Sequence, residues 1–392
     1  MDCIVLLKSI IYLDDILPLV FELKKIGFVS SPIFVATNKK QYEFLRKNVV
    51  LCDGISHVGG RLTTLNAYGN RYIRNLHNIF VLRKYFYKRV LTIEVAFAKS
   101  FWVSVLSVLN RKVWKGKIMG TWLHNKPYNQ LHNNVMYIRT VKENFEVMDI
   151  VARGYDAVLL SYTKEQYEKL TLERLITADA KVIQVRNTRR LNEWISFLEN
   201  NRGKYLPKEL KRPYVFFPLS IIGKHIKGED CLSSTDKLKE VLLVLKEFNN
   251  DILTVFKPHH KTDLDGVKEI IRLVGFRNYI VSYAHPLLLI KQAKFTLSYH
   301  STSVLIEAYL SGCPTVEYAH YDSRFFEYNE GRSRYLECVD YFIHRDKEQL
   351  RGVLKKLIYE EVIQVKRDLI KRKKDFPILS NKEIKERFSE IM

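Results

Sequence analysis

The chain has 392 residues, which is enough for two domains of ordinary size, and its 47% hydrophobic and 27% charged residues are typical of a globular protein. Five cysteines without CxxC spacing argue against a disulfide framework and against a zinc site. A formal net charge of +21 indicates an anionic partner, and three kinds would account for it: a phosphorylated or acidic small molecule, an anionic membrane surface, or nucleic acid.

Targeting and membrane-spanning segments are not evident in the sequence. No basic segment and no cleavage site accompany the apolar start of the chain, and no uninterrupted apolar run approaches about 18 residues. We therefore expect a cytoplasmic protein. The dense basic stretch 366–374 would allow peripheral association with the cytoplasmic face of the inner membrane, although a solvated helical face explains it equally well. No nucleic-acid-binding motif appears, so nucleic acid is not expected as a partner.

Strands and helices alternate along the first 200 residues. In chain order, the apolar spacing predicts a strand Cys3–Leu7, a helix Ile16–Lys25, a strand Pro32–Ala36, a helix Lys39–Lys47, a helix Thr92–Leu109, a strand Lys117–Trp122, a strand Ala157–Ser161, a helix Lys164–Leu170 and a strand Lys181–Val185. Such alternation indicates a mostly parallel sheet with helices on both faces.

A second alternating run follows the polar segment 200–213, which contains Gly203, Pro207 and Pro213 and is the predicted domain boundary. In chain order, we expect a strand Tyr214–Leu219, a helix Thr235–Phe248, a strand Ile252–Phe256, a helix Asp265–Val274, a strand Tyr279–Val281, a helix Leu287–Ala293, a strand Phe295–Tyr299, a helix Val304–Leu310 and a strand Thr315–Tyr318. The chain from 347 onward is predicted to be helical and charged, and to fold back across both domains.

This pattern predicts an α/β protein of the GT-B architecture, in which two Rossmann-like, doubly wound domains face a central cleft and a C-terminal helix crosses back. The domains are placed at 1–200, for the acceptor, and 212–360, for the nucleotide-sugar donor, with a basic helical tail at 361–392. Neither a GxGxxG turn after the first strand nor a Walker A sequence is present, which disfavours dinucleotide oxidoreductases and P-loop NTPases.

Two segments of the second half suit an anionic ligand. His300, Ser301, Thr302 and Ser303 form a polar turn between a strand and a helix, where backbone N–H groups and the helix dipole favour phosphate. Lys257, His259 and His260 follow another strand, whose end should lie at the same edge of the sheet. The histidines could instead be solvated in a surface loop, and one of the three hydroxyls is expected to cap the helix.

The helix after the polar turn carries one acidic residue, Glu307, in its first turn. A solvated carboxylate is one interpretation. A bidentate hydrogen bond to the diol of a ribose is the other, and both remain open from the sequence.

The motifs KPHH, HPLLLIKQAKFTLSYHSTS and EAYLSGCPTV resemble the C-terminal domain of bacterial surface-polysaccharide glycosyltransferases, over about residues 212–320. Within that group the chain looks most like the retaining β-Kdo transferases of capsule and lipopolysaccharide O-antigen assembly, which use CMP-Kdo. The resemblance implies that Lys257 and His259 bind the nucleotide phosphate together with Ser301, Thr302 and Ser303. It also implies that Glu307 holds the ribose. The chain departs from the family where His259-His260 replaces a His-Pro pair.

The same resemblance extends to YVFFPLSIIGKHIKGED and implies that Asp230 is the nucleophile of a double displacement with retention. Glu229 and Asp236 compete for this position, and a loop acid without a role is an equal alternative. For the acid that activates the acceptor we choose Glu143, with Glu146 and Asp15 as alternatives.

These inferences predict a glycosyltransferase that moves Kdo from CMP-Kdo onto a growing bacterial surface glycan, either free or lipid-linked, without a metal or other cofactor. An inverting CMP-sialic acid, CDP-glycerol or CDP-ribitol transferase is the alternative enzyme. The alternatives of another class are an inactive GT-B scaffold and a basic protein that binds nucleic acid.

Overall fold

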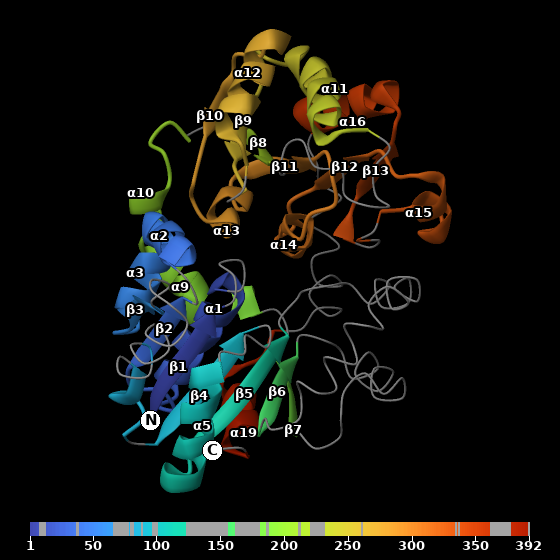
Figure 1. Ribbon diagram of the computed structural model, residues 1–392. Helices are drawn as coiled ribbons and strands as arrows, with labels where there is room; N and C mark the ends of the chain where they lie inside the picture. Colours follow the sequence, from blue (N-terminus) through green and yellow to red (C-terminus); the bar gives the residue numbers. More distant parts are fainter. Residues whose placement is uncertain are drawn as a thin grey trace. The chain divides into compact units, whose positions relative to one another are not determined.

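The computed structural model describes residues 1–7, 13–36, 39–65, 78, 82–87, 89–95, 101–122, 156–160, 181–185, 188–210, 213–219, 232–259, 262–333, 335, 338–360 and 378–390. These residues form two compact units (Figure 1). The described residues up to 198 together with 378–390 make the first unit, and 199–360 make the second. No helix among them combines the length and the apolarity that crossing a bilayer requires.

The first unit is built on a seven-stranded parallel sheet in the order β3-β2-β1-β4-β5-β6-β7 (Figure 1). Its strands are β1 (Asp2–Leu7), β2 (Pro32–Ala36), β3 (Arg61–Thr64), β4 (Val90–Val95), β5 (Lys117–Trp122), β6 (Ala157–Leu160) and β7 (Lys181–Gln184). Its helices are α1 (Leu13–Lys25), α2 (Lys39–Lys47), α3 (Val49–His57), α5 (Phe101–Trp114), the 3-10 helix η2 (Thr188–Arg190), α9 (Asn192–Asn200) and α19 (Asn381–Ser389).

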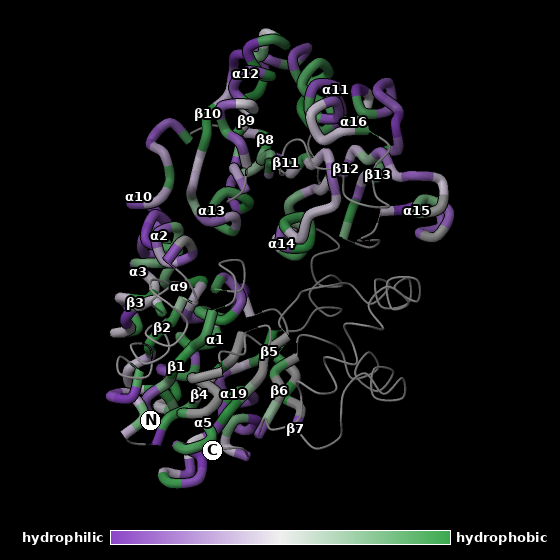
Figure 2. The backbone as a smooth tube through the Cα atoms, viewed as in Figure 1, coloured by the Kyte–Doolittle hydropathy of each residue, from purple (hydrophilic) through white to green (hydrophobic). Residues whose placement is uncertain are grey.

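Parallel strands with helices on both faces are apolar almost without interruption, and β1 shows why this sheet forms. Cys3 to Leu7 are all buried, and Cys3 pairs with Pro32 of β2 on one side and with Leu91 of β4 on the other. In Figure 2 the central strands of this sheet are coloured hydrophobic. The C-terminal helix α19 contacts α1 and buries Ile384 and Phe388, so the end of the chain returns to the N-terminal unit, as predicted.

The second unit has a six-stranded parallel sheet in the order β10-β9-β8-β11-β12-β13. Its strands are β8 (Tyr214–Pro218), β9 (Leu253–Lys257), β10 (Tyr279–Val281), β11 (Ala293–Ser298), β12 (Thr315–Ala319) and β13 (Tyr341–His344). Its helices are α10 (Arg202–Tyr205), α11 (Ser234–Lys246), α12 (Leu264–Val274), α13 (Pro286–Ile290), α14 (Val304–Leu310), α15 (Ser323–Tyr328) and α16 (Lys347–Tyr359).

Helices cover both faces of the second sheet (Figure 1). On one face, α11, α12 and α16 pack on alternate strand residues such as Val215 and Phe217. On the other face, α13 and α14 pack on the intervening residues, including Tyr214 and Phe216. Strand order reverses between β8 and β11, and ligands of doubly wound sheets bind beyond the carboxyl ends of the strands at that reversal.

The described elements confirm most of the predicted alternation, and one helix prediction is wrong. Thr92–Leu109 was expected to be one helix, but its first residues belong to strand β4 and the helix α5 begins at Phe101. The continuous apolar run fits either structure. The pairing of β4 with β1 and β5 explains why this segment is a strand. Its β-branched side chains, such as Val90 and Ile93, are buried on the two faces of the sheet.

Candidate functional site at the carboxyl edge of the second sheet

The polar turn predicted to bind phosphate lies between β11 and α14, at the carboxyl edge of the sheet. The Ser298 hydroxyl, at the end of β11, donates to the His300 carbonyl oxygen at 2.6 Å and accepts from the His300 backbone N–H at 3.4 Å. The His300 ring packs edge-on against Tyr299 at 5.0 Å. Ser298 therefore fixes where the chain turns away from the sheet and where the imidazole of His300 lies.

Of the three hydroxyls expected to offer a cap for α14, that of Ser303 stands at the N-cap position and does not cap the helix. Ser303 is the N-cap residue but makes no side-chain capping hydrogen bond. Its backbone is already helical (φ −61°, ψ −15°), whereas a capping serine is normally extended. The nearest substitute is the Thr302 hydroxyl, which accepts from the Val304 N–H two residues away at 3.4 Å.

His300 is held in its neutral form. Burial, reinforced by the positive charges of Lys237 and His259, lowers the pKa of His300 to about 3. His259 lies just beyond β9, where its carbonyl oxygen accepts from the Thr262 N–H at 2.8 Å. The charge of His259 thus acts on the His300 ring, and Lys257 ends β9, which β8 separates from β11 in the sheet.

Lys237, which the sequence analysis missed, is the charged centre of this edge. It lies in the first turns of α11, the helix that follows β8, and its side chain is 0% exposed. Buried lysines are rare, because removing an ammonium group from water costs free energy unless negative charge or hydrogen bonds compensate for it. The signal was present in the sequence: Lys237 occupies the same helical face as Val241, Val244 and Leu245, where a core residue is expected.

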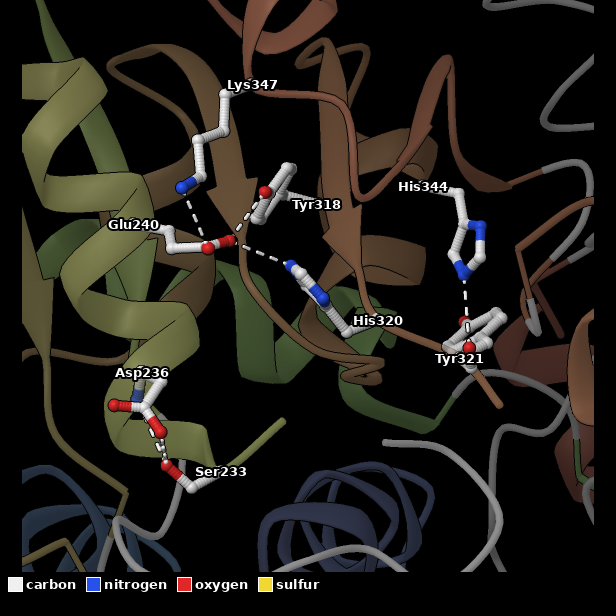
Figure 3. Close-up of polar contacts among 8 residues, drawn as sticks. All are labelled: Ser233, Asp236, Glu240, Tyr318, His320, Tyr321, His344 and Lys347. Atoms are coloured by element: carbon white, nitrogen blue, oxygen red, sulfur yellow. Dashed lines mark hydrogen bonds and ion pairs between the residues drawn. The ribbon is translucent and has the colours of Figure 1, made fainter. Parts of the chain in front are cut away.

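Glu240, one turn after Lys237, joins three elements (Figure 3). Its Oε2 atom accepts from the Tyr318 hydroxyl at 2.7 Å and lies 3.0 Å from His320 Nε2, while its Oε1 atom lies 2.9 Å from Lys347 Nζ. Burial opposes ionisation, but the hydrogen bonds from Lys347 and Tyr318 outweigh it and lower the pKa of Glu240. The carboxylate is ionised at neutral pH and ties α11 to β12 and α16.

His320 follows β12 directly and is also neutral. Burial lowers its pKa, the Glu240 carboxylate opposes this, and the charge of Lys237 adds to it. Because an ionised carboxylate only accepts hydrogen bonds, a neutral His320 carries its proton on Nε2. Beyond it, His344 Nε2 lies 3.1 Å from the Tyr321 carbonyl oxygen (Figure 3), and burial lowers the pKa of His344 as well.

Two further carboxylates of this unit are buried. Glu307 is 2% exposed in α14, so the interpretation as a solvated carboxylate is wrong. Glu317 in β12 accepts from the Tyr321 hydroxyl at 2.6 Å and from the Ser333 hydroxyl at 2.5 Å. These bonds satisfy both oxygens of Glu317 and explain how the sheet interior tolerates it.

The acids expected to act on the sugar and the acceptor are only partly within the described residues. Asp230, Glu229, Glu143 and Glu146 lie outside them, as does His260. Asp236 is exposed and accepts from the Ser233 hydroxyl at 2.6 Å at the start of α11 (Figure 3). Asp15, in the first unit, is buried and lies 2.7 Å from Arg189 Nε. An acid stabilised as the anion by a guanidinium is a weak base, which disfavours Asp15 as the activating acid.

Among the residues that the structure describes, no three His, Cys, Asp or Glu side chains gather as they would around a metal ion. The basic groups that follow the carboxyl ends of β9, β11 and β12 are His259, His300 and His320, and the charge of Lys237, at the start of α11, acts on the last two. We call this set the edge cluster. Such a set can bind an oxyanion through charge and N–H donors.

Among the solved structures similar to this chain, two are complexes with UDP and one is assigned as a UDP-N-acetylglucosamine 2-epimerase. A UGT transferase of Siraitia grosvenorii in complex with UDP aligns with TM-score 0.57 and 11% identity, over 100% of this chain and 99% of that one. HepE of Anabaena in complex with UDP and glucose aligns with TM-score 0.51 and 13% identity, over 100% and 98%. A Listeria monocytogenes protein assigned as a UDP-N-acetylglucosamine 2-epimerase aligns with TM-score 0.55 and 13% identity, over 100% and 97%.

No protein-family model matches the sequence, and no curated protein is similar to it at a significant level. At 11–13% identity the structural likeness defines the fold. The chain has two Rossmann-like halves of parallel strands with flanking helices, as in the GT-B glycosyltransferases. Because an epimerase shares this fold, the reaction has to be inferred from the site.

Proposed function

We propose that the protein is a glycosyltransferase that uses a nucleotide-activated sugar, and that the edge cluster binds the phosphate of the donor. The observation that carries this proposal is the completely buried Lys237 at the start of α11, whose charge acts on both His300 and His320. A buried ammonium supplies one full positive charge, and a neutral imidazole such as that of His300 can donate one N–H to an anion, whereas the N–H of His320 is directed at Glu240. The likeness to proteins solved with UDP supports a nucleotide as the anion.

The donor that we propose is CMP-Kdo, because of the resemblance of residues 212–320 to the retaining β-Kdo transferases. Kdo bears a carboxylate, so its donor presents two anionic groups to a cationic edge. In this scheme the turn at Ser301, Thr302 and Ser303 contacts the phosphate and Glu307 contacts the ribose. The burial of Glu307 supports this role, because its carboxylate is shielded from solvent.

The proposed reaction is a double displacement. The Asp230 carboxylate attacks the anomeric carbon, and the bond from that carbon to the phosphate oxygen breaks, releasing CMP. An acceptor hydroxyl then attacks the same carbon, its proton passes to Glu143, and the bond to Asp230 breaks. Positive charge from Lys237 stabilises the leaving phosphate in the first step.

A second candidate is a transferase or epimerase of UDP-sugars, and the likeness to HepE, to the UGT transferase and to the Listeria protein favours it. The same edge cluster would bind a diphosphate. The donors of the two candidates differ in their nucleobase and in their number of phosphates. Turnover measured with a series of nucleotide sugars therefore distinguishes the candidates.

The test is incubation with CMP-Kdo, without acceptor, followed by intact-mass measurement and by assay of released CMP. We expect a covalent glycosyl adduct on Asp230 that Asp230→Asn abolishes. Asp236→Asn is the matched control: it lies in the same region, and its exposed side chain contacts Ser233, so the adduct should persist. Turnover of UDP-N-acetylglucosamine or UDP-glucose with no reaction of CMP-Kdo would establish the second candidate, and inertness toward every donor would overturn both.

A further inference from the structure

Helix α5 of the first unit carries a group of exposed apolar side chains near its C-terminal end. Val108 is 45% exposed, Leu109 51%, Val113 66% and Trp114 47%. Single exposed apolar residues are ordinary on protein surfaces, whereas several on adjoining turns mark a place of contact. Val108, Leu109 and Val113 lie on the side of the helix away from the buried Ser107 and Asn110, and Trp114 is the last residue of the helix.

The segment before β4 extends this surface. The Asn110 side chain donates to the Phe86 carbonyl oxygen at 2.8 Å and accepts from the Val90 N–H at 3.3 Å, and Arg89 Nε donates to the Lys115 carbonyl oxygen at 3.2 Å. These bonds hold the end of α5 against Phe86, Arg89 and Val90. Tyr87 of this segment is 62% exposed.

Basic residues surround the apolar ones. Arg83, Lys84, Arg89, Lys112 and Lys115 are all exposed, and the sequence from 101 to 117 contains no acidic residue. Asp156 approaches this end of α5 and pairs with Arg111 at 3.1 Å. We call the five exposed apolar residues (Tyr87, Val108, Leu109, Val113 and Trp114) and these five basic residues the α5 patch; Figure 2 shows both hydrophilic and hydrophobic colours on this part of the first unit.

The combination of side chains favours one kind of partner. Aliphatic residues such as Leu109 and Val113 gain from an apolar interior, which nucleic acid does not offer. Lys112 and Lys115 gain from a dense negative charge, and tyrosine and tryptophan prefer the boundary between water and hydrocarbon. A bilayer that contains anionic lipids supplies all three, and amphipathic helix surfaces of this composition enter its headgroup region.

We propose that the α5 patch docks the protein on an anionic lipid bilayer. The C-terminal end of α5 lies next to the amino end of β4, since Arg89 directly precedes that strand and contacts Lys115. The patch is therefore at the edge of the first sheet opposite the carboxyl edge where ligands of this fold bind. Docking there would leave that carboxyl edge accessible, and it requires no part of the proposed donor chemistry.

The experiment is cosedimentation of the full chain with vesicles of phosphatidylcholine alone and of phosphatidylcholine with phosphatidylglycerol. We expect binding to the anionic vesicles and about a tenfold or greater loss of affinity in each of two double variants, Leu109→Ser/Val113→Ser and Lys112→Gln/Lys115→Gln. The matched control is Lys268→Gln/Leu273→Ser on α12, which changes an exposed lysine and an apolar residue that is 65% exposed, and which should bind as the wild type does.

A second readout does not depend on the double variants. Brominated lipids should quench the tryptophan fluorescence of the bound protein, and Trp114→Phe should remove most of that quenching. Equal binding to neutral and anionic vesicles, or unchanged affinity in both double variants, would overturn the proposal. Loss of affinity for random duplex DNA rather than for vesicles in the lysine variant would overturn it too, in favour of nucleic acid.

Discussion

The Nε2 atom of His320 lies 3.0 Å from the Oε2 atom of Glu240, and this contact connects the carboxyl end of β12 to α11 one turn after Lys237. The carboxylate holds the imidazole proton on Nε2. It also orients the ring at the edge where the proposed donor phosphate binds. Glu240 is thus a positioning residue of the edge cluster, and Tyr318 and Lys347 hold it in turn.

Replacement of Glu240 by glutamine should lower the stability of the protein and the pKa of His320. The amide cannot accept three charge-assisted bonds, so we expect the free energy of unfolding to fall by about 2 kcal/mol. The pKa of His320 should fall further, because the Glu240 carboxylate now opposes the effect of burial. Denaturant unfolding and histidine NMR titration measure the two effects. The control is Glu247→Gln at the end of the same helix, whose exposed pair with Arg351 should contribute about 1 kcal/mol or less.

Stability should decrease in acid because of His300. Its pKa is about 3 in the folded protein against 6.5 for an ordinary histidine, so between these values the unfolded chain binds a proton that the folded chain does not. The free energy of unfolding therefore falls as the pH drops from 6.5 toward 3, and above 6.5 this contribution is complete. His300→Gln should flatten that dependence, as measured by urea unfolding at a series of pH values. Parallel curves for the two proteins would contradict the assignment.

The hydroxyl of Ser303 should matter little to folding. Because it makes no capping hydrogen bond, Ser303→Ala is expected to change the free energy of unfolding by less than about 0.5 kcal/mol. Ser233 provides the comparison within the same unit: its hydroxyl accepts from the Asp236 N–H at 3.2 Å at the start of α11, so Ser233→Ala should cost about 1 kcal/mol. Similar losses in the two variants would show that Ser303 caps α14 in solution.

Asp15 should prove structural rather than catalytic. Arg189→Met leaves a buried carboxylate without its guanidinium partner, and we expect a loss of about 3 kcal/mol in the free energy of unfolding. Asp15→Asn should keep turnover within about threefold of the wild type, whereas removal of a general base lowers rates about a hundredfold or more. A rate loss of that size in a folded Asp15→Asn protein would restore Asp15 as the acid that activates the acceptor.

Much of the fold could be predicted from the sequence because its strands are fully buried. Segments such as Pro32–Ala36 and Tyr279–Val281 are short apolar runs between polar breaks, and the structure has strands at the same residues. The strand β3 was missed because Arg61–Thr64 is a polar edge strand, which lacks the apolar run that marks the central ones. Pairing with β2 creates this strand, and pairing is not visible in a local pattern.

The functional site, like the fold, could be predicted from the sequence only in part. His259 and His300 could be placed at one edge because each follows a predicted strand, and the carboxyl ends of parallel strands coincide. Glu240 and His320 could not be joined in this way, since they are 80 residues apart and meet only when α11 packs against the sheet. Lys237 was visible as a charge on an apolar helical face, a local conflict that often marks a functional residue.

The most direct test of the donor site is calorimetric titration of the wild type and of Lys237→Met with CMP, with UDP in parallel. Methionine is similar in size to lysine and removes a buried charge, so the variant should be at least as stable as the wild type. We predict that the wild type binds CMP and that Lys237→Met binds it about tenfold more weakly or worse. Equal affinity for CMP in the two proteins, or no binding of either nucleotide by the wild type, would contradict a donor phosphate site at the edge cluster.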